Sequence, residues 1–185
     1  AGRMDDMSVG IECLLAQDLD RALMIAQSLD ELNQDRKLVE GKMQQEALKH
    51  LELLSVHAGG NVSVCLYQAQ WHQGVIGLLA SRIKEKLYRP VIAFAPAQDG
   101  LSDAEMTDGE FELKGSGRSI PGFHLRDALD LVAKKIPHVL NKFGGHAMAA
   151  GLSIKQKHLP EFEAAFEQVA RTLLTPELLV NQVIT

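Results

Sequence analysis

Residues 143–151 combine two adjacent glycines, a histidine and a run of small residues that ends in another glycine. Glycine allows backbone angles and close approaches that no residue with a side chain allows. The small residues after Gly144, Gly145 and His146 would let a second backbone or a ligand come unusually near. The histidine could then donate a hydrogen bond to a polar group in that space. The segment therefore predicts a functional site, and a histidine that merely stabilises a turn is the alternative.

A second candidate is the pentapeptide 115–119, Gly-Ser-Gly-Arg-Ser. A glycine-rich turn can aim consecutive amide groups at an anion, and Ser116 and Ser119 would add hydroxyl donors. The planar guanidinium of Arg118 matches two phosphate oxygens. The spacing does not fit a P-loop. The pentapeptide is thus a candidate phosphate site, although taken alone it favours the alternative, a polar surface turn.

A third candidate pairs Trp71 with His72 just before an expected helix. Such a pair could stack a nucleic-acid base or cap the helix dipole, but packing of this single tryptophan is the favoured interpretation. A catalytic set does not emerge: the seven histidines are scattered, and the only carboxylate cluster is Asp5-Asp6. We predict neither a catalytic residue nor a metal site in this chain.

Composition indicates a folded domain rather than a nucleic-acid coat. The 185 residues are 46% hydrophobic and 23% charged, with a formal net charge of −5, which argues against binding nucleic acid through the overall field but leaves room for a local basic groove. No apolar run could span a membrane, and the start does not resemble a signal peptide. Cys13 and Cys65 lack metal-ligand spacing and predict small buried hydrophobes in a reducing compartment, so a cytoplasmic location is expected. The absence of an initiator Met, with strand-like residues at the other end, suggests a fragment of a longer protein.

Periodicity predicts a layered α/β domain, with a mixed β-sheet flanked by helices, preceded by a long connecting helix. That helix would be about 50 Å long, longer than a compact domain needs, and would bridge two domains; a coiled coil is the alternative. An exposed acidic loop is expected at 97–109. The expected helices are 7–16, 19–54, 74–88, 125–135 and 159–174, and the expected strands are 61–68, 90–95, 110–119 and 148–154.

Taken together and in this order, the motifs closely resemble the RecJ family of single-stranded-DNA-specific exonucleases, in the DHH phosphoesterase superfamily. The motifs are residues 1–6, the long helix, 71–77, 115–119 and 144–151, so the resemblance covers essentially the whole chain. It implies that residues 1–17 are the tail of the catalytic DHH domain and 18–56 the connecting helix. Residues 58–174 would be the DHH-associated, substrate-binding domain, and 175–185 the start of a following segment.

The resemblance also implies a division of labour. In that family the DHH domain binds two Mn²⁺ or Mg²⁺ ions that activate water for attack on a phosphodiester, and this chain contains no DHH triplet. It implies that Ser116, Arg118 and Ser119 bind phosphate near a 5′ end, that Gly144, Gly145 and His146 line the same cleft, and that Arg3 adds a phosphate contact. Single-stranded DNA is the implied partner, with a single-strand-binding protein and a RecQ-type helicase as further partners.

Three functions follow from these observations. The first is the substrate-binding part of a 5′→3′ single-stranded-DNA exonuclease, acting in DNA repair and recombination and inactive by itself. The second is a non-catalytic nucleic-acid-binding module, like the associated domain of alanyl-tRNA synthetases. The third is a phosphoesterase of the same superfamily that cleaves small nucleotides or oligonucleotides. The long helix and the continuation past residue 174 favour the first.

Overall fold

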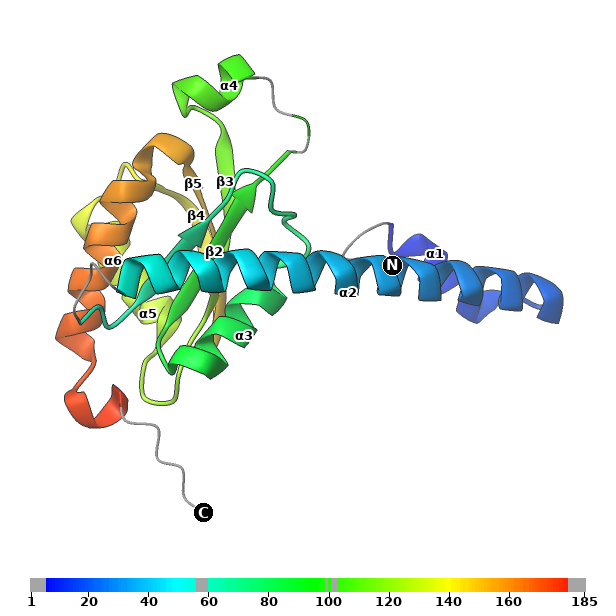
Figure 1. The fold of residues 1–185 in the computed structure, drawn as a ribbon, viewed down its shortest axis with the longest axis horizontal. Coiled ribbons are helices and arrows are strands. Elements are labelled where there is room, and N and C mark those ends of the chain that lie inside the picture. Colours follow the sequence, from blue (N-terminus) through cyan, green and yellow to red (C-terminus); the bar gives the residue numbers. More distant parts are fainter. Residues whose placement is uncertain (1–5, 56–59, 99, 101–102, 180–185) are drawn as a thin grey trace.

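A five-stranded mixed β-sheet forms the centre of the computed structural model, which describes residues 6–55, 60–98, 100 and 103–179 (Figure 1). The strand order is β1-β2-β3-β5-β4. Strands β1 (Val64–Tyr67) and β2 (Val91–Pro96) are parallel, and the other neighbours pair antiparallel. Helix α3 (Ile76–Leu87) makes the crossover between the parallel pair. The remaining strands are β3 (Glu112–Arg118), β4 (Leu140–Gly145) and β5 (Ala149–Lys155). The mixed sheet expected from the sequence is confirmed.

Helices α5 (Leu125–Lys135) and α6 (Leu159–Leu173) cover one face of the sheet and bury the larger part of the core. Phe94 of β2 meets Phe162 of α6 edge to face, with ring centroids 5.5 Å apart. Such aromatic pairs add stability beyond the area that they bury. The α5–α6 layer therefore holds its face of the sheet through large apolar side chains.

The opposite face packs against α3 and the long helix α2 (Leu19–Ser55). Because side chains alternate along a strand, β2 contributes Ile92 and Phe94 to the first core and Val91, Ala93 and Ala95 to this second one. Trp71 is almost fully buried here, and its indole Nε1 donates to Oε2 of Glu46 on α2 at 2.9 Å. The long helix is thereby anchored to the sheet domain.

Helix α2 has 37 residues and extends well beyond the sheet, with α1 (Ser8–Leu15) alongside its overhanging part (Figure 1). Both α1 and the overhanging part of α2 present apolar side chains to solvent. The exposed ones are Met7, Ile11, Leu14 and Leu15 in or next to α1, and Leu19, Leu23 and Met24 in α2. Exposed apolar side chains grouped in this way are typical of a contact with another domain or protein.

Three expectations need correction. The expected strand 110–119 is present, but the glycine-rich turn expected within it at 115–119 is not: Gly115–Arg118 lie inside β3, paired with β2 on one side and β5 on the other. The acidic segment 97–109 is not wholly a loop, because it contains the short helix α4 (Asp103–Asp108). Strand β4 was not expected from the sequence. The other predicted helices and strands are present, with ends that differ by up to three residues.

The two cysteines are only partly buried, whereas the sequence predicted buried side chains. Both are free, and burial raises the pKa of the Cys65 thiol well above its usual value. Cys65 packs against the first core. Within the described part of the chain, no helix combines the length and the apolar character that crossing a membrane requires.

The packing of β3 gives a first prediction, the destabilisation of Gly115→Ala. A Cβ at Gly115 would lie 2.6 Å from Cε1 of Phe94 and 2.9 Å from Cγ of Leu152, so both core side chains must move. Overpacking of this kind costs about 1–3 kcal/mol of the free energy of unfolding. Urea denaturation followed by circular dichroism measures it.

Gly41→Ala is the matched control. Gly41 is exposed on α2, and a Cβ there meets no atom within 4 Å. Because alanine favours helix, this variant should gain up to about 1 kcal/mol. If Gly115→Ala is as stable as the unsubstituted chain, the close packing of β3 is not a constraint.

Candidate nucleic-acid interface

Strand β3 directs Ser116 and Arg118 to the face of the sheet that α3 covers. The alternate residues Gly115 and Gly117 face the other core, where added Cβ atoms would meet Phe94 and Leu125. Nη1 of Arg118 donates to Oγ of Ser116 at 3.0 Å and to the carbonyl oxygen of Gly117 at 2.7 Å. The guanidinium therefore lies along its own strand, and the serine and arginine form one unit that presents hydrogen-bond donors.

The first turn of α3 approaches this pair very closely. A Cβ at Gly77 would lie 2.8 Å from Nη2 of Arg118 and 3.0 Å from Oγ of Ser116. Glycine at this position therefore leaves room for the Arg118 guanidinium and the Ser116 hydroxyl where they lie. The fold in this way joins the 71–77 and 115–119 motifs, and the positive end of the α3 dipole lies beside the arginine. Both favour an anion at this place.

The glycine–histidine segment forms the end of β4 and the turn into β5. Gly144 pairs with Gly151, which in turn pairs with Ser116, and Gly145 pairs with Ala150. The His146 amide donates to the Ala149 carbonyl at 2.8 Å and closes the turn. Gly144 therefore lies two strands from Ser116, about 10 Å away. Glycine at 151 leaves bare backbone between them, over which a polymer chain could pass.

The two adjacent glycines are required for different reasons. Gly145 has φ 143°, and a Cβ there would lie 2.4 Å from the Ala149 carbonyl oxygen, so the hairpin itself requires it. Gly144 is exposed, and a Cβ there would meet no atom within 4 Å. The fold does not need glycine at position 144. A surface that must stay open for a ligand would explain why glycine is found there.

Two lysines lie on the same surface, and one of them, Lys114, pairs with Glu112 at 3.0 Å. Lys114 and Lys142 line a shallow hollow of about 360 Å³ that also includes Gly144, Gly151 and Ser153. The pKa of the Glu112 carboxyl is lowered by Ser153, Lys114 and Lys142, against the effect of its burial. The sequence interpretation missed both lysines. The sequence could have identified Lys114, because residues 114, 116 and 118 share one face of a strand.

The remaining candidate residues differ in their surroundings. The Ser119 hydroxyl is buried and donates to the Phe123 carbonyl oxygen at 2.7 Å, so it serves the fold. The His146 side chain is exposed in the hairpin turn. Nδ1 of His72 accepts from the Gly74 amide at 3.0 Å, and Trp71 is buried, which agrees with the favoured structural interpretation of that pair. Arg3 lies outside the described residues.

The donors at this interface do not fit a divalent metal ion. Arg118, Lys114 and Lys142 are cations that would repel one, whereas Mg²⁺ and Mn²⁺ require carboxylate and other oxygen ligands. The same donors fit an oxyanion, because guanidinium, ammonium and hydroxyl groups all donate hydrogen bonds. The surface can therefore bind and orient a phosphate chain.

Comparison with known proteins identifies the family of this domain. The family model for the DHHA1 domain matches residues 59–172. Over its whole length, the chain is 48% identical to the single-stranded-DNA-specific exonuclease RecJ of Salmonella typhimurium and 47% identical to that of Escherichia coli. It spans 30% of the length of each of these relatives.

Solved structures give the same relationship. RecJ of Thermus thermophilus in complex with Mg²⁺ matches 94% of this chain at a TM-score of 0.73 and 27% identity, and the match covers 24% of that protein. A structure of RecJ bound to manganese matches 97% of this chain at a TM-score of 0.72, covering 40% of that protein. Because the DHHA1 model covers more than half of its residues, the chain belongs to the DHHA1 domain family, and along its whole length it is similar to a segment of RecJ.

Proposed function

We propose that this chain is the substrate-binding part of a metal-dependent 5′→3′ single-stranded-DNA exonuclease. Ser116 and Arg118 bind a backbone phosphate near the 5′ end, and Gly144, Gly145 and His146 line the path of the strand. The observation that carries the proposal is the row Ser116–Gly151–Gly144, with a donor pair at one end and bare backbone toward the other. The relatives named as single-stranded-DNA-specific exonucleases support the substrate class.

The contribution of this chain to the reaction is binding and orientation. A phosphate held by the Arg118 guanidinium is fixed in both position and rotation, because the planar group can engage two oxygens at once. Holding the strand in this way places the next phosphodiester at a defined distance from the metal-binding part of the enzyme. The hydrolytic ions, Mn²⁺ or Mg²⁺, belong to parts of the full-length protein outside this chain.

The proposal includes the division into parts. Residues 1–17 would be the tail of the catalytic domain, 18–56 the connecting helix, 58–174 the associated domain and 175–185 the start of the next segment. The exposed apolar side chains of α1 and early α2 support a neighbouring domain there. Arg3 would add a phosphate contact from that side. The proposal also includes a cytoplasmic location and a role in DNA repair and recombination. The proposed partners are a single-strand-binding protein and a RecQ-type helicase.

The phosphate pocket gives the second prediction. Arg118→Ala should weaken binding of a 5′-phosphorylated oligothymidine about tenfold and lower the slope of log affinity against log salt by about 1, because one phosphate contact is lost. A 5′-hydroxyl strand should bind the unsubstituted chain more weakly and be affected less by the substitution. Fluorescence anisotropy over a series of salt concentrations measures all three quantities.

Arg171→Ala is the charge-matched control. Arg171 lies on α6, which covers the opposite face of the sheet, and pairs with Glu167 at 2.8 Å. Its removal should leave the affinity for DNA unchanged. Equal binding of the two strand types, insensitive to salt and to Arg118→Ala, would contradict a phosphate pocket at this place.

The bare backbone at Gly144 gives the third prediction. Gly144→Val should fold with nearly unchanged stability, because the position is exposed and open, and valine favours strands. It should nonetheless reduce the affinity for single-stranded DNA several-fold, because the side chain stands on the path of the strand. Thermal unfolding and anisotropy on the same sample separate the two effects.

Gly145→Val is the paired variant. The positive φ and the nearby Ala149 carbonyl should make it destabilising by more than about 1 kcal/mol. A folded Gly144→Val variant that binds DNA as well as the unsubstituted chain would mean that the strand does not cross this row.

A further inference from the structure

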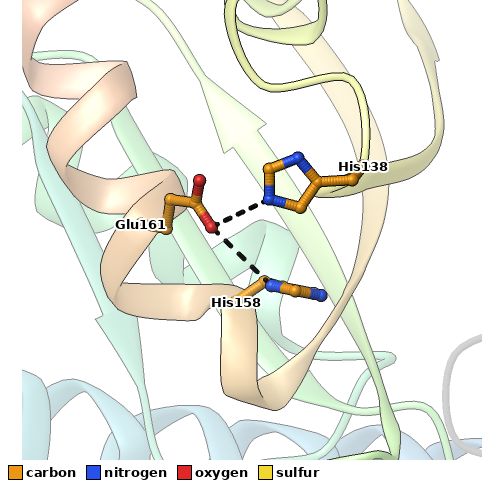
Figure 2. A group of neighbouring side chains, drawn as sticks. All are labelled: His138, His158 and Glu161. Atoms are coloured by element: carbon orange, nitrogen blue, oxygen red, sulfur yellow. Dashed lines mark hydrogen bonds and ion pairs between the residues drawn. The ribbon is translucent and has the colours of Figure 1, made fainter.

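Three potential metal ligands converge on the edge of the domain where α5, β4 and α6 meet (Figure 2). His138 lies between α5 and β4, and His158 is the last residue of the 3₁₀ helix η1 (Gln156–His158). Glu161 lies in the first turn of α6. His158 and Glu161 are close in sequence, at positions i and i+3, whereas His138 lies 23 residues before Glu161 and is brought to them by the tertiary fold.

The distances among these side chains match those of a metal site. Oε2 of Glu161 lies 3.2 Å from Nε2 of His138 and 3.8 Å from Nδ1 of His158, and the three ligand atoms lie within 4.8 Å of one another. In a tetrahedral zinc site with bonds of about 2.0–2.1 Å, two ligand atoms lie about 3.3–3.4 Å apart. Small side-chain movements would therefore complete the geometry.

The donor types indicate which ions the cluster would take. Two imidazole nitrogens and one carboxylate suit Zn²⁺ and its neighbours Co²⁺, Ni²⁺ and Cu²⁺, whereas Mg²⁺ prefers oxygen ligands alone. Three protein ligands leave a fourth position for water. We propose that His138, His158 and Glu161 form a binding site for a divalent transition metal of the zinc type.

A metal in this site would connect segments that the sheet connects only indirectly. His138 lies just before β4, the strand that ends in Gly144 and Gly145, and the other two ligands lie at the start of α6. The ion would thus tie the start of β4 to the helix layer.

The competing explanation is a simple ion pair of Glu161 with protonated histidines. The exposed fractions of the His138 and Glu161 side chains are 60% and 45%, and exposed pairs contribute little. The two explanations differ in pH dependence. An ion pair strengthens as the imidazoles protonate, whereas metal binding requires neutral imidazoles and weakens.

The test is titration of the tag-free, metal-free chain with zinc chloride by isothermal calorimetry. One ion should bind per chain, and the affinity should be lower in acidic buffer because protons compete with the metal for the imidazole nitrogens. Binding should persist in excess magnesium chloride. Saturating Zn²⁺ should raise the melting temperature by about 5 °C when its free concentration is a hundred times the dissociation constant.

Two variants and a matched control make the assignment specific. His158→Ala and Glu161→Gln should each weaken Zn²⁺ binding by more than about tenfold, because loss of a direct ligand exceeds the usual effect of losing a supporting group. His124→Asn is the control. Nδ1 of His124 lies 3.2 Å from Oδ2 of Asp127, which makes a histidine–carboxylate pair without a third ligand. Asparagine at this position preserves the N-cap of α5. The zinc affinity of this variant should be unchanged.

Cobalt substitution gives a readout of the ligands themselves. The Co²⁺-loaded chain should show visible d–d absorption without a thiolate charge-transfer band, and these bands should disappear in His158→Ala. Absence of zinc binding would overturn the proposal. So would binding that His158→Ala and Glu161→Gln leave unchanged, or a thiolate band that assigns the ion to Cys13 or Cys65.

Discussion

The structure depends on the packing of β3 on both of its faces at once. On one face, Gly115 and Gly117 let Phe94, Leu152 and Leu125 approach the backbone. On the other, Gly77 lets α3 come within contact of Ser116 and Arg118. A side chain at Gly115 would press on Phe94 and Leu152, and one at Gly117 or Gly77 would displace the end of Leu125 or Arg118. Glycine at these positions therefore keeps the neighbouring side chains, the arginine included, where they lie.

This constraint explains why a binding surface can exist beside a dense core. The residues of β3 alternate between close packing and polar display, so the strand serves the core and the interface together. The hairpin of β4 and β5 continues the row with Gly151 and Gly144. Because α3 packs mainly against β2 and β3, the part of the face that β5 and β4 form keeps bare backbone with lysines at its rim. Positive charge is thus local in a chain whose net charge is −5.

The long helix has a different role from the sheet domain. It is held at one end by burial of Met43 and Ala47 and by the hydrogen bond between Glu46 and Trp71. Its other end carries exposed apolar residues beside α1. The sole tryptophan is therefore a structural anchor between helix and sheet. Its place next to the glycine-rich start of α3 reflects the need to fix that helix, rather than contact with a base.

Much of this fold could be predicted because it follows local patterns. The helical repeat of 125–135 and 159–174 and the apolar run of 90–95 are readable one segment at a time. Strand β4 could not be predicted in this way. Its sequence, Leu-Asn-Lys-Phe-Gly-Gly, contains no β-branched residue, and it is a strand only because it pairs with β5. The prediction of a glycine-rich turn at 115–119 was wrong for a related reason. Considered alone, its glycines are typical of a turn. Only the structure shows that core side chains pack against them.

The amino-acid sequence by itself determined the class of fold, the long helix, and the candidate residues Ser116, Arg118, Gly144, Gly145 and His146, because these depend on residue type and short-range spacing. Only the tertiary structure decided which of them meet. In the structure, Gly77 lies against Arg118 and the Ser119 hydroxyl is buried. Lys114 and Lys142 line the candidate surface as well. The tertiary fold also brought His138 to His158 and Glu161. Proximity in space arises from sheet register and layer packing, which no local spacing records.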